Sequence, residues 1–554
     1  MNNILQILDT KQKKIIFYLF LIALLITILE VLSVGLIFPI IDYVIKGDNS
    51  NFNDFFIGFS NFFSINLINL KKKIIIVFII FFIFKSFLVI YLQYLLADFT
   101  QKINVNLANR LFEGYLQLDY KFFNKRYTTA DIIRNIINET ASVYSYIYNF
   151  IILTIELSIA VIIFLTILAV SFKISLVLIS FSSLFGYFFI IFFRRRINKW
   201  GKQRIKFNKD RIKSLQESFL NFEFIKLDIF KNSFFKKFYM PNFYVNIINR
   251  NIKVINILPR IFIELIIILS VFLIISYFYL QNKKLEEFLP LLSLYAVAAL
   301  KIAPSFSRIL NSLNNLKFNY PSLKLLVIEL NKIKLNKSKK INSGLSFEKS
   351  LNLKLAQFRY NSSDVNQKKY NLNLQKNHTY VIHGESGSGK TTLIKILLGL
   401  LKLDSGQIFL DNKKVDTDNE NYKKLFGYVP QNIYLYNDTI KNNILLGRKI
   451  SDKLFNKIID DSSLKYFYKK KGANFQIGEN GNKISGGEKQ RIALARSLVT
   501  NPEILIFDEF TSSLDEKNIQ KVLSTIRILH KKKTIIIVTH DPSKIKFANK
   551  KYKI

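Results

Sequence analysis

The first 310 residues contain long apolar runs separated by polar stretches. Each run has 20 residues or more, enough to cross the hydrocarbon core of a bilayer. They predict six membrane-spanning helices, at residues 15–41, 74–98, 147–170, 174–193, 256–280 and 287–310. Beyond residue 310 the apolar runs shorten into strands and amphipathic helices typical of a soluble α/β domain. The pattern predicts a membrane protein with a soluble C-terminal domain.

Loop charge predicts the orientation of the spans. Lys11, Lys13 and Lys14 precede the first span, and a strongly basic stretch follows the fourth at residues 194–213. Cytoplasmic loops are enriched in Lys and Arg, so both termini should be cytoplasmic, although Lys71–Lys73 then fall outside. The cytoplasmic stretches at about 99–146 and 194–255 have few Pro or Gly residues. We expect long coupling helices there.

The composition agrees with a membrane protein and excludes some classes of site. Half of the 554 residues are hydrophobic and the net charge is +41. No nucleic-acid recognition module is visible, so basic loops and a general abundance of lysine account for the charge, and no nucleic-acid partner is expected. The absence of cysteine excludes disulfides and thiolate metal sites. The first apolar run is too long for a signal-peptide core.

A phenylalanine-rich stretch follows the first predicted span. In residues 52–63 the phenylalanines recur at spacings of three and four, which places them on one face of a helix. The stretch is too short and polar to span a membrane, so it predicts a helix lying in the membrane interface. The alternative is a loop that is rich in Phe by composition alone.

A glycine-rich loop follows a short apolar strand in the C-terminal part. HGESGSGKTT matches G-x-x-x-x-G-K-[ST], in which backbone amides approach phosphates, the lysine reaches the β- and γ-phosphates, and the hydroxyl residue binds Mg²⁺. The helix LIKILLGLL follows and adds a favourable N-terminal dipole. We expect ATP and Mg²⁺ here, held by Gly384, Ser386, Gly387, Ser388, Gly389, Lys390, Thr391 and Thr392.

Two further strands end in polar residues. EILIFDEF predicts a buried strand that delivers Asp508 to the metal and places Glu509 to polarise the attacking water. KTIIIVTH predicts another buried strand that ends at His540. Any one of these stretches is compatible with a structural strand and turn, but all of them in this order predict an ATP-hydrolysing site.

The most specific stretch is ISGGEKQRIALARSL, which resembles the signature of ATP-binding-cassette (ABC) transporters. Six spans and one cassette resemble an ABC half-exporter, so the resemblance covers the whole chain. It implies that the helix N-terminus at Ser485, Gly486 and Gly487 closes over ATP held by the other subunit. It also implies roles for Tyr360 (adenine stacking), Gln431 (sensing Mg²⁺), Ser512 to Asp515 (the D-loop), His540 (contact with the γ-phosphate) and residues 478–481 (contact with coupling helices).

The cassette departs from the common pattern at a few positions. In the signature, Ile484 replaces Leu and Glu488 replaces Gln, and neither change predicts an inactive site. His383 precedes the glycine-rich loop where an apolar residue is usual, and is interpreted as a strand-end residue without a catalytic part. Because one chain supplies one phosphate loop and one signature, the resemblance implies a dimer. A homodimer is predicted, with a heterodimer as the alternative.

Ionisable residues inside predicted spans are costly and usually mark a pathway or a partner. Basic groups there would suit an anionic head group such as a lipid phosphate. Pairing is the alternative, between Arg260 and Glu264 at i,i+4 or between Lys85 and either Glu30 or Glu156. The set comprises Glu30, Lys85, Glu156, Arg260, Glu264 and Lys301.

Local strings in the membrane half and one in the cassette resemble PglK-type flippases of lipid-linked oligosaccharides. The resembling stretches are LEVLSVGLIFPII, NFEFIKL, LPRIFIEL, ALKIAPSFSRI and GYVPQNIYLYNDTIKNNI. The resemblance implies that Lys85, Arg260 and Lys301 line a cavity and engage a lipid pyrophosphate. That family has arginine at all three positions, and the two lysines here keep the charge but lose the bidentate fork. The family also has an external amphipathic helix where residues 52–63 lie.

These features predict a six-span helical domain followed by an α/β P-loop domain, as in ABC exporters. The expected boundaries are 1–325 for the transmembrane domain, 326–346 for a linker and 347–554 for the nucleotide-binding domain. The expected function is ATP-driven flipping of a polyprenyl-pyrophosphate-linked oligosaccharide across the inner membrane, with the cassette in the cytoplasm. The alternatives are an exporter of peptides or hydrophobic small molecules and a non-transporting regulatory membrane ATPase.

Overall fold

The computed structural model describes residues 7–35, 67–170, 172–227, 231–280, 285–335, 344–359, 369–510 and 516–554. The chain divides into two compact units. The helical unit comprises residues 1–117 and 126–336, and the α/β unit comprises residues 118–125 and 337–554. This is the predicted fold class, a helical membrane domain and a P-loop nucleotide-binding domain.

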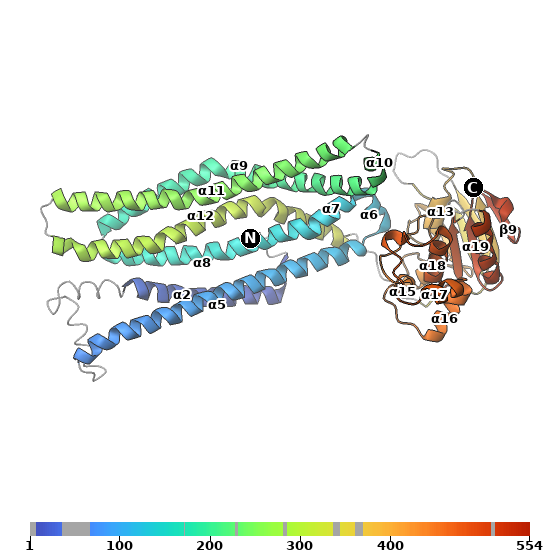
Figure 1. Ribbon diagram of the computed structural model, residues 1–554, viewed down its shortest axis with the longest axis horizontal. Coiled ribbons are helices and arrows are strands. Elements are labelled where there is room, and N and C mark those ends of the chain that lie inside the picture. The colour runs from blue at the N-terminus through green and yellow to red at the C-terminus, as the bar shows by residue number, and fades with distance from the viewer. Residues whose placement is uncertain are drawn as a thin grey trace. The chain divides into compact units, whose positions relative to one another are not determined.

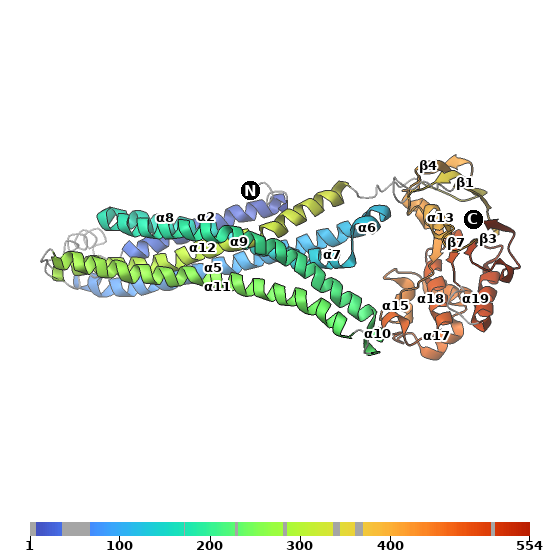
Figure 2. The ribbon, with the colours of Figure 1, turned by 90° about the horizontal axis from the view of Figure 1, so that it is seen from above.

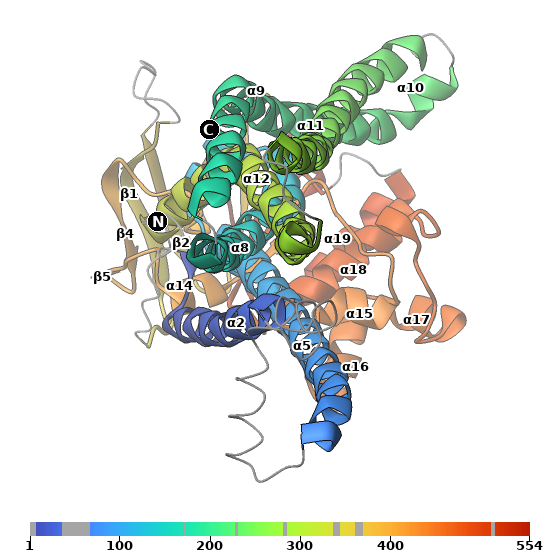
Figure 3. The ribbon, with the colours of Figure 1, turned by 90° about the vertical axis from the view of Figure 1, so that its left-hand side faces the viewer.

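Six long helices form the helical unit within the described residues, with α8 and α12 packed together and α9 beside α11 (Figures 1 and 2). Their axes are roughly aligned in Figure 1, and Figure 3 views the same helices from the left-hand side of that view. Shorter elements connect them: α7 (Thr129–Ile133), the π-helix η2 (Arg134–Glu139) and α10 (Phe222–Lys226). The long helices are α2 (Thr10–Gly35), α5 (Leu67–Leu116), α8 (Thr140–Val170), α9 (Phe172–Leu220), α11 (Lys231–Leu280) and α12 (Leu285–Leu335).

Membrane-spanning character is visible in four of these helices within the described residues. Stretches long and apolar enough to cross a membrane are Thr10–Glu30, Ile79–Leu116, Thr129–Ile162 and Lys231–Leu273. The predicted spans at 174–193 and 287–310 lie in α9 and α12, where many side chains fall outside the described set. The phenylalanine-rich stretch at 52–63 lies outside the described residues.

Arg204 of α9 ties three parts of the helical unit together. Its guanidinium donates to Asn319 Oδ1 (3.0 Å) and Ser322 Oγ (2.9 Å) of α12 and to Ser142 Oγ (2.9 Å) of α8. Glu139, which is fully buried at the end of η2, lies 4.0 Å away. These three hydrogen bonds and the nearby carboxylate offset much of the cost of burying the guanidinium, whose Nε has no hydrogen-bond partner among the described residues, so the cluster links three helices.

Replacing Arg204 with alanine is expected to destabilise the protein by about 3–5 kcal/mol, because Glu139 would keep its buried charge without a counter-ion. Thermal unfolding of the detergent-solubilised protein measures this. Lys202, exposed on the same helix, supplies the matched control, and its alanine variant should stay within about 0.5 kcal/mol of wild type. Equal unfolding temperatures for the two variants would contradict the described role of Arg204.

The α/β unit contains two sheets among its described residues. One is antiparallel in the order β2-β1-β4-β5, and the other is parallel in the order β6-β7-β8-β3-β9. The antiparallel strands are β1 (Ser350–Gln357), β2 (Tyr370–Gln375), β4 (Ser405–Leu410) and β5 (Lys413–Lys414). The parallel strands are β3 (Thr379–His383), β6 (Phe426–Val429), β7 (Ile504–Asp508), β8 (Thr534–Val538) and β9 (Lys550–Lys553).

Helices pack around the parallel sheet because its strands are apolar on both faces. Every residue of β7 and β8 is buried, as expected for central parallel strands covered on both sides. The helices are α13 (Lys390–Leu397), α14 (Glu420–Lys424), α15 (Ile440–Leu445), α16 (Asp452–Asp461), α17 (Lys465–Lys471), α18 (Gly486–Leu498) and α19 (Glu516–Leu529), with short 3₁₀ turns η3 (Glu479–Gly481) and η4 (Pro542–Lys544).

Residues 118–125, the docked segment, belong to the α/β unit although they follow α5 along the chain. Helix α6 (Tyr120–Arg126) begins in this segment, and Asp119 caps it by accepting from the backbone N–H of Lys121 at 2.9 Å. The Lys121 ammonium donates to the carbonyl oxygen of Arg359 at 3.0 Å. Tyr120 packs against a hydrophobic cluster of the α/β unit. The docked segment is therefore anchored by both polar and apolar contacts.

Candidate functional site

The glycine-rich loop connects β3 to α13, as the sequence predicts. Gly387 and Gly389 have φ of +81° and +100°, which L side chains rarely adopt. Lys390 is 5% exposed, and its ammonium donates to the carbonyl oxygens of Gly384 (2.9 Å) and Glu385 (2.8 Å). The loop is thus shaped around the lysine, with the N-terminus of α13 at its end. This arrangement can bind the phosphates of a nucleotide.

Asp508 ends β7 and is 3% exposed. Its Oδ2 accepts a hydrogen bond from the Tyr428 hydroxyl at 3.0 Å, while its buried Oδ1 has no hydrogen-bond partner among the described residues. Burial and the negative charge of Glu509 raise the pKa of Asp508. A buried carboxylate oxygen without a partner suits a hard divalent cation, so the residues present fit Mg²⁺.

Glu509 is held from two sides. Its Oε1 lies 2.8 Å from Nε2 of His540, and its Oε2 accepts from Nε2 of Gln431 at 2.6 Å. Its backbone has φ of +46°, a left-handed conformation that is uncommon for a non-glycine residue and often found at functional sites. Three residues predicted to act together, from the ends of β6, β7 and β8, are therefore in direct contact.

The sheet order explains how these residues meet. Strand β8 lies between β7 and β3 and is parallel to both, so their carboxyl ends share one edge. The glycine-rich loop follows β3. Asp508 is the last residue of β7 and Glu509 comes directly after it, while His540 lies two residues beyond β8. Ligands of open α/β sheets bind at the carboxyl ends of the strands. The buried strands thus place the phosphate loop and the carboxylates together.

The signature stretch opens α18. Ser485 is the N-cap residue, with its hydroxyl accepting from the backbone N–H of Glu488 at 3.3 Å and the Glu488 carboxylate accepting from the backbone N–H of Ser485 at 2.8 Å. This is a capping box, which accepts either Glu or Gln at its third position. The replacement of Gln by Glu488 therefore preserves the local geometry around Gly486 and Gly487.

Replacing Glu488 with alanine is expected to lower stability by about 1 kcal/mol, because the capping box loses one of its two hydrogen bonds. Glutamine at the same position should cost less than about 0.5 kcal/mol, since its amide oxygen can accept the same bond. Thermal unfolding of the full-length protein in detergent compares the two variants. An equal loss for both would show that the negative charge, and not the capping box, is what Glu488 contributes.

The remaining predicted residues of the cassette fall partly outside the described residues. Tyr360 and the D-loop at Ser512 to Asp515 lie outside the described residues. Thr391 and Thr392 are the second and third residues of α13, next to Lys390. His383 ends β3, where its carbonyl oxygen accepts from the backbone N–H of Ile554 at 2.9 Å, a strand-end role.

The basic residues predicted to bind a lipid pyrophosphate are paired where they are described. The Lys85 ammonium lies 2.5 Å from Glu30 and 3.2 Å from Ser33 Oγ, and its side chain is 6% exposed. Arg260 lies 2.9 Å from Glu264 on the same helix, and its side chain is 77% exposed. Both pairs are the alternatives that the sequence leaves open. The backbone of Lys301 lies in α12, but its side chain is outside the described set.

The structure gives three residues partners that the sequence did not predict. Arg308, near the end of the last predicted span, pairs with Glu156 at 2.5 Å. Arg204 lies in a basic run that gave no hint of burial. Tyr428 stands three residues before Gln431 in GYVPQN, and a tyrosine so close to a predicted site residue was the available signal.

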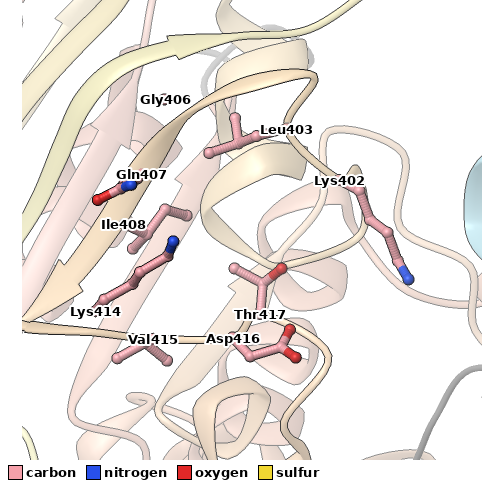
Figure 4. A pocket seen from close by; sticks show the side chains of 9 residues that line it. All are labelled: Lys402, Leu403, Gly406, Gln407, Ile408, Lys414, Val415, Asp416 and Thr417. Carbon is pink, nitrogen blue, oxygen red and sulfur yellow. The ribbon is translucent and has the colours of Figure 1, made fainter.

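A separate cavity of about 470 Å³ lies in the α/β unit near β4 and β5 (Figure 4). It is lined by residues 402–403, 406–408 and 414–417, and none of these belongs to the glycine-rich loop or the carboxylate pair. Lys402 at its edge is bound to Asp418 at 2.6 Å. The cavity is therefore distinct from the candidate nucleotide site.

Comparisons with known proteins agree with this geometry. Residues 15–298, more than half of the chain, match the family described as ABC transporter transmembrane region, and residues 367–512 match the family described as ABC transporter. A bacterial Atm1-family ABC exporter solved with ATP bound has the same fold, with a TM-score of 0.73, 20% identity, and coverage of 99% of this chain and 94% of the other.

Curated relatives match over a shorter region. An export ATP-binding/permease protein of Rickettsia typhi is 40% identical over 207 residues, which is 36% of each chain. ATP-dependent lipid A-core flippases of Wigglesworthia glossinidia brevipalpis and Aliivibrio fischeri are 39% and 36% identical over 189 and 186 residues. The alignment thus spans about a third of the length of these relatives. The two family matches and the shared fold show that this chain belongs to the ABC transporters and has the exporter arrangement of a helical membrane domain followed by a nucleotide-binding cassette.

Proposed function

We propose that this protein is an ATP-driven flippase that moves a polyprenyl-pyrophosphate-linked oligosaccharide or a related glycolipid across the inner membrane. The observation that carries the ATP-driven part is Glu509, which contacts His540 and Gln431 and follows Asp508, whose Oδ1 has no partner among the described residues. Relatives named as lipid A-core flippases support a glycolipid as the cargo.

The residues of the cassette divide the work of hydrolysis. Lys390 and the backbone amides of the glycine-rich loop hold the phosphates of ATP, and Asp508, Thr391 and Gln431 hold Mg²⁺. The metal ion, when bound, neutralises charge on the β- and γ-phosphates. Glu509, fixed by its two neighbours, orients the attacking water and accepts its proton.

The working unit in this proposal is a homodimer. Each chain has one glycine-rich loop and one signature, at Gly384–Thr392 and Ser485–Gly487. Each ATP would be enclosed by the loop of one subunit and the signature of the other. The signature of this chain keeps its glycines and an intact capping box, which supports two equivalent sites.

Lys85 has a specific part in the glycolipid proposal. An unpaired ammonium at membrane depth is costly, so Glu30 serves as its counter-ion while no cargo is bound. A diphosphate carries more negative charge than one carboxylate, so it can displace Glu30 and take the ammonium. Arg260, which is largely exposed, and Lys301 would supply further positive charge to the same head group.

A second candidate function is export of peptides or hydrophobic small molecules. The observation that favours it is that Lys85 and Arg260, the two of the three basic residues whose side chains are described, are both paired with acids. ATP hydrolysis by the purified protein in nanodiscs distinguishes the two. The flippase proposal predicts stimulation by a polyprenyl-pyrophosphate oligosaccharide but not by the same lipid bearing one phosphate and no glycan. Stimulation by peptides alone would instead support the second candidate.

A further inference from the structure

Tyr428 connects the docked segment to the metal-binding carboxylate. Its hydroxyl donates to Asp508 Oδ2 at 3.0 Å, which leaves Oδ1 as the carboxylate oxygen without a partner among the described residues. A carboxylate fixed through one oxygen presents the other in a defined direction. Tyr428 is half-buried at the end of β6, next to Val429, so its own position is restricted by packing.

Tyr428 shares a hydrophobic cluster with the docked segment. Tyr120 and Tyr428 pack against the same hydrophobic cluster, and Tyr120 is close enough to contribute, after burial and Asp508, to the raised pKa of the Tyr428 hydroxyl. The ammonium of Lys395, on α13, lies 5.4 Å above the Tyr120 ring and is among the charges that act on Asp508. Tyr120 thus lies against Lys395 and shares its hydrophobic cluster with Tyr428, and both of these residues act on Asp508.

We propose that Tyr428 is a positioning residue that aims the free oxygen of Asp508 at Mg²⁺, and that Tyr120 of the docked segment sets this position through Tyr428 and Lys395. The inference rests on the proposed ATP-hydrolysing function. It gives the docked segment, which is continuous with membrane helix α5, a direct effect on the metal site. Docking of the segment then becomes a condition for tight binding of the nucleotide with its metal ion.

The test measures binding of a fluorescent ATP analogue to the full-length protein as Mg²⁺ is added, in the Glu509→Gln background so that no hydrolysis occurs. Tyr428→Phe removes only the hydroxyl and should raise the half-saturating Mg²⁺ concentration about tenfold, as expected for one lost hydrogen bond to a charged group. Binding without Mg²⁺ should not change, because the phosphate loop is untouched. An unchanged Mg²⁺ requirement would overturn the positioning role.

Tyr422 supplies the matched control. It is a fully buried tyrosine of the same cluster, and its hydroxyl donates to the Leu397 carbonyl oxygen at 2.8 Å. Tyr422→Phe therefore also loses one hydrogen bond from a buried ring, and should lower the unfolding temperature without changing the Mg²⁺ requirement. If both phenylalanine variants raise the Mg²⁺ requirement equally, loosened packing explains the effect and the proposal fails.

A double-mutant cycle tests the part of Tyr120. Tyr120→Ala should raise the half-saturating Mg²⁺ concentration in the same direction, and Tyr120→Ala combined with Tyr428→Phe should be no worse than Tyr428→Phe alone, because both act through one hydrogen bond. Additive effects, or no effect of Tyr120→Ala, would remove Tyr120 from the proposal. Since no transported substrate is present, a failure here is distinguishable from failure of the flippase proposal.

Discussion

Replacing Glu509 with glutamine is expected to lower the rate of ATP hydrolysis by about 100-fold or more while leaving ATP binding intact. A positioned general base contributes about 10²- to 10⁴-fold to a rate, and the amide of glutamine cannot accept the proton of the attacking water. Gln431 and His540 lie 2.6 and 2.8 Å from the carboxylate, so the substituted side chain should keep its place. Phosphate release by the purified protein gives the rate, and a fluorescent ATP analogue gives the affinity.

Glu503 offers a matched control for this variant. It immediately precedes the same strand, β7, at the opposite end from Asp508, and its exposed carboxylate pairs with Lys376 at 3.5 Å. Glu503→Gln should therefore hydrolyse ATP at the wild-type rate. If Glu509→Gln retained more than about a tenth of the wild-type activity, a group other than Glu509 would be the base.

Replacing Lys85 with methionine is expected to destabilise the protein by about 3–5 kcal/mol, because Glu30, whose side chain is only 15% exposed, would lose the ammonium that lies 2.5 Å away. Replacing both partners, as Lys85→Met with Glu30→Leu, should restore most of this loss, since two apolar side chains of similar size can replace a buried pair. Thermal unfolding in detergent measures both. Arg260→Met, at an exposed pair, should cost less than about 1 kcal/mol.

The double variant also distinguishes a structural role of Lys85 from a role in transport. A protein that folds normally without Lys85 and Glu30 but no longer moves a pyrophosphate-linked glycolipid would assign the ammonium to the cargo. Wild-type transport by the double variant would leave the Lys85–Glu30 pair with a purely structural role. In that case the pair would resemble Arg308–Glu156, which links two helices.

The nucleotide site was largely predictable from the sequence because its parts are contiguous. The glycine-rich loop needs its glycines and Lys390 within nine residues, and Asp508 and Glu509 follow directly from a fully apolar strand. The order of motifs along the chain then fixes the fold class. The hydrogen bond from Tyr428 to Asp508 could not be predicted from these motifs, because it depends on β6 and β7 being neighbours in the sheet.

The membrane half was predictable in outline only. Apolar runs locate the helices, but the rotation of each helix about its axis decides which side chains meet. Lys85 had two acidic candidates in sequence, and packing selects Glu30, while Glu156 is taken by Arg308. Arg204 looks like one more basic loop residue until η2 brings Glu139 close to it. Side-chain partners between distant helices are set by packing, which a single sequence does not specify.

The most direct test of the central proposal is reconstitution in liposomes with a fluorescent polyprenyl-pyrophosphate oligosaccharide. A membrane-impermeant quencher reports its movement between leaflets, because it reaches only the lipid in the outer leaflet. We expect ATP-dependent movement with the wild-type protein and none with Glu509→Gln. Wild-type protein that hydrolyses ATP at its normal rate but leaves the glycolipid in its original leaflet would contradict the flippase proposal.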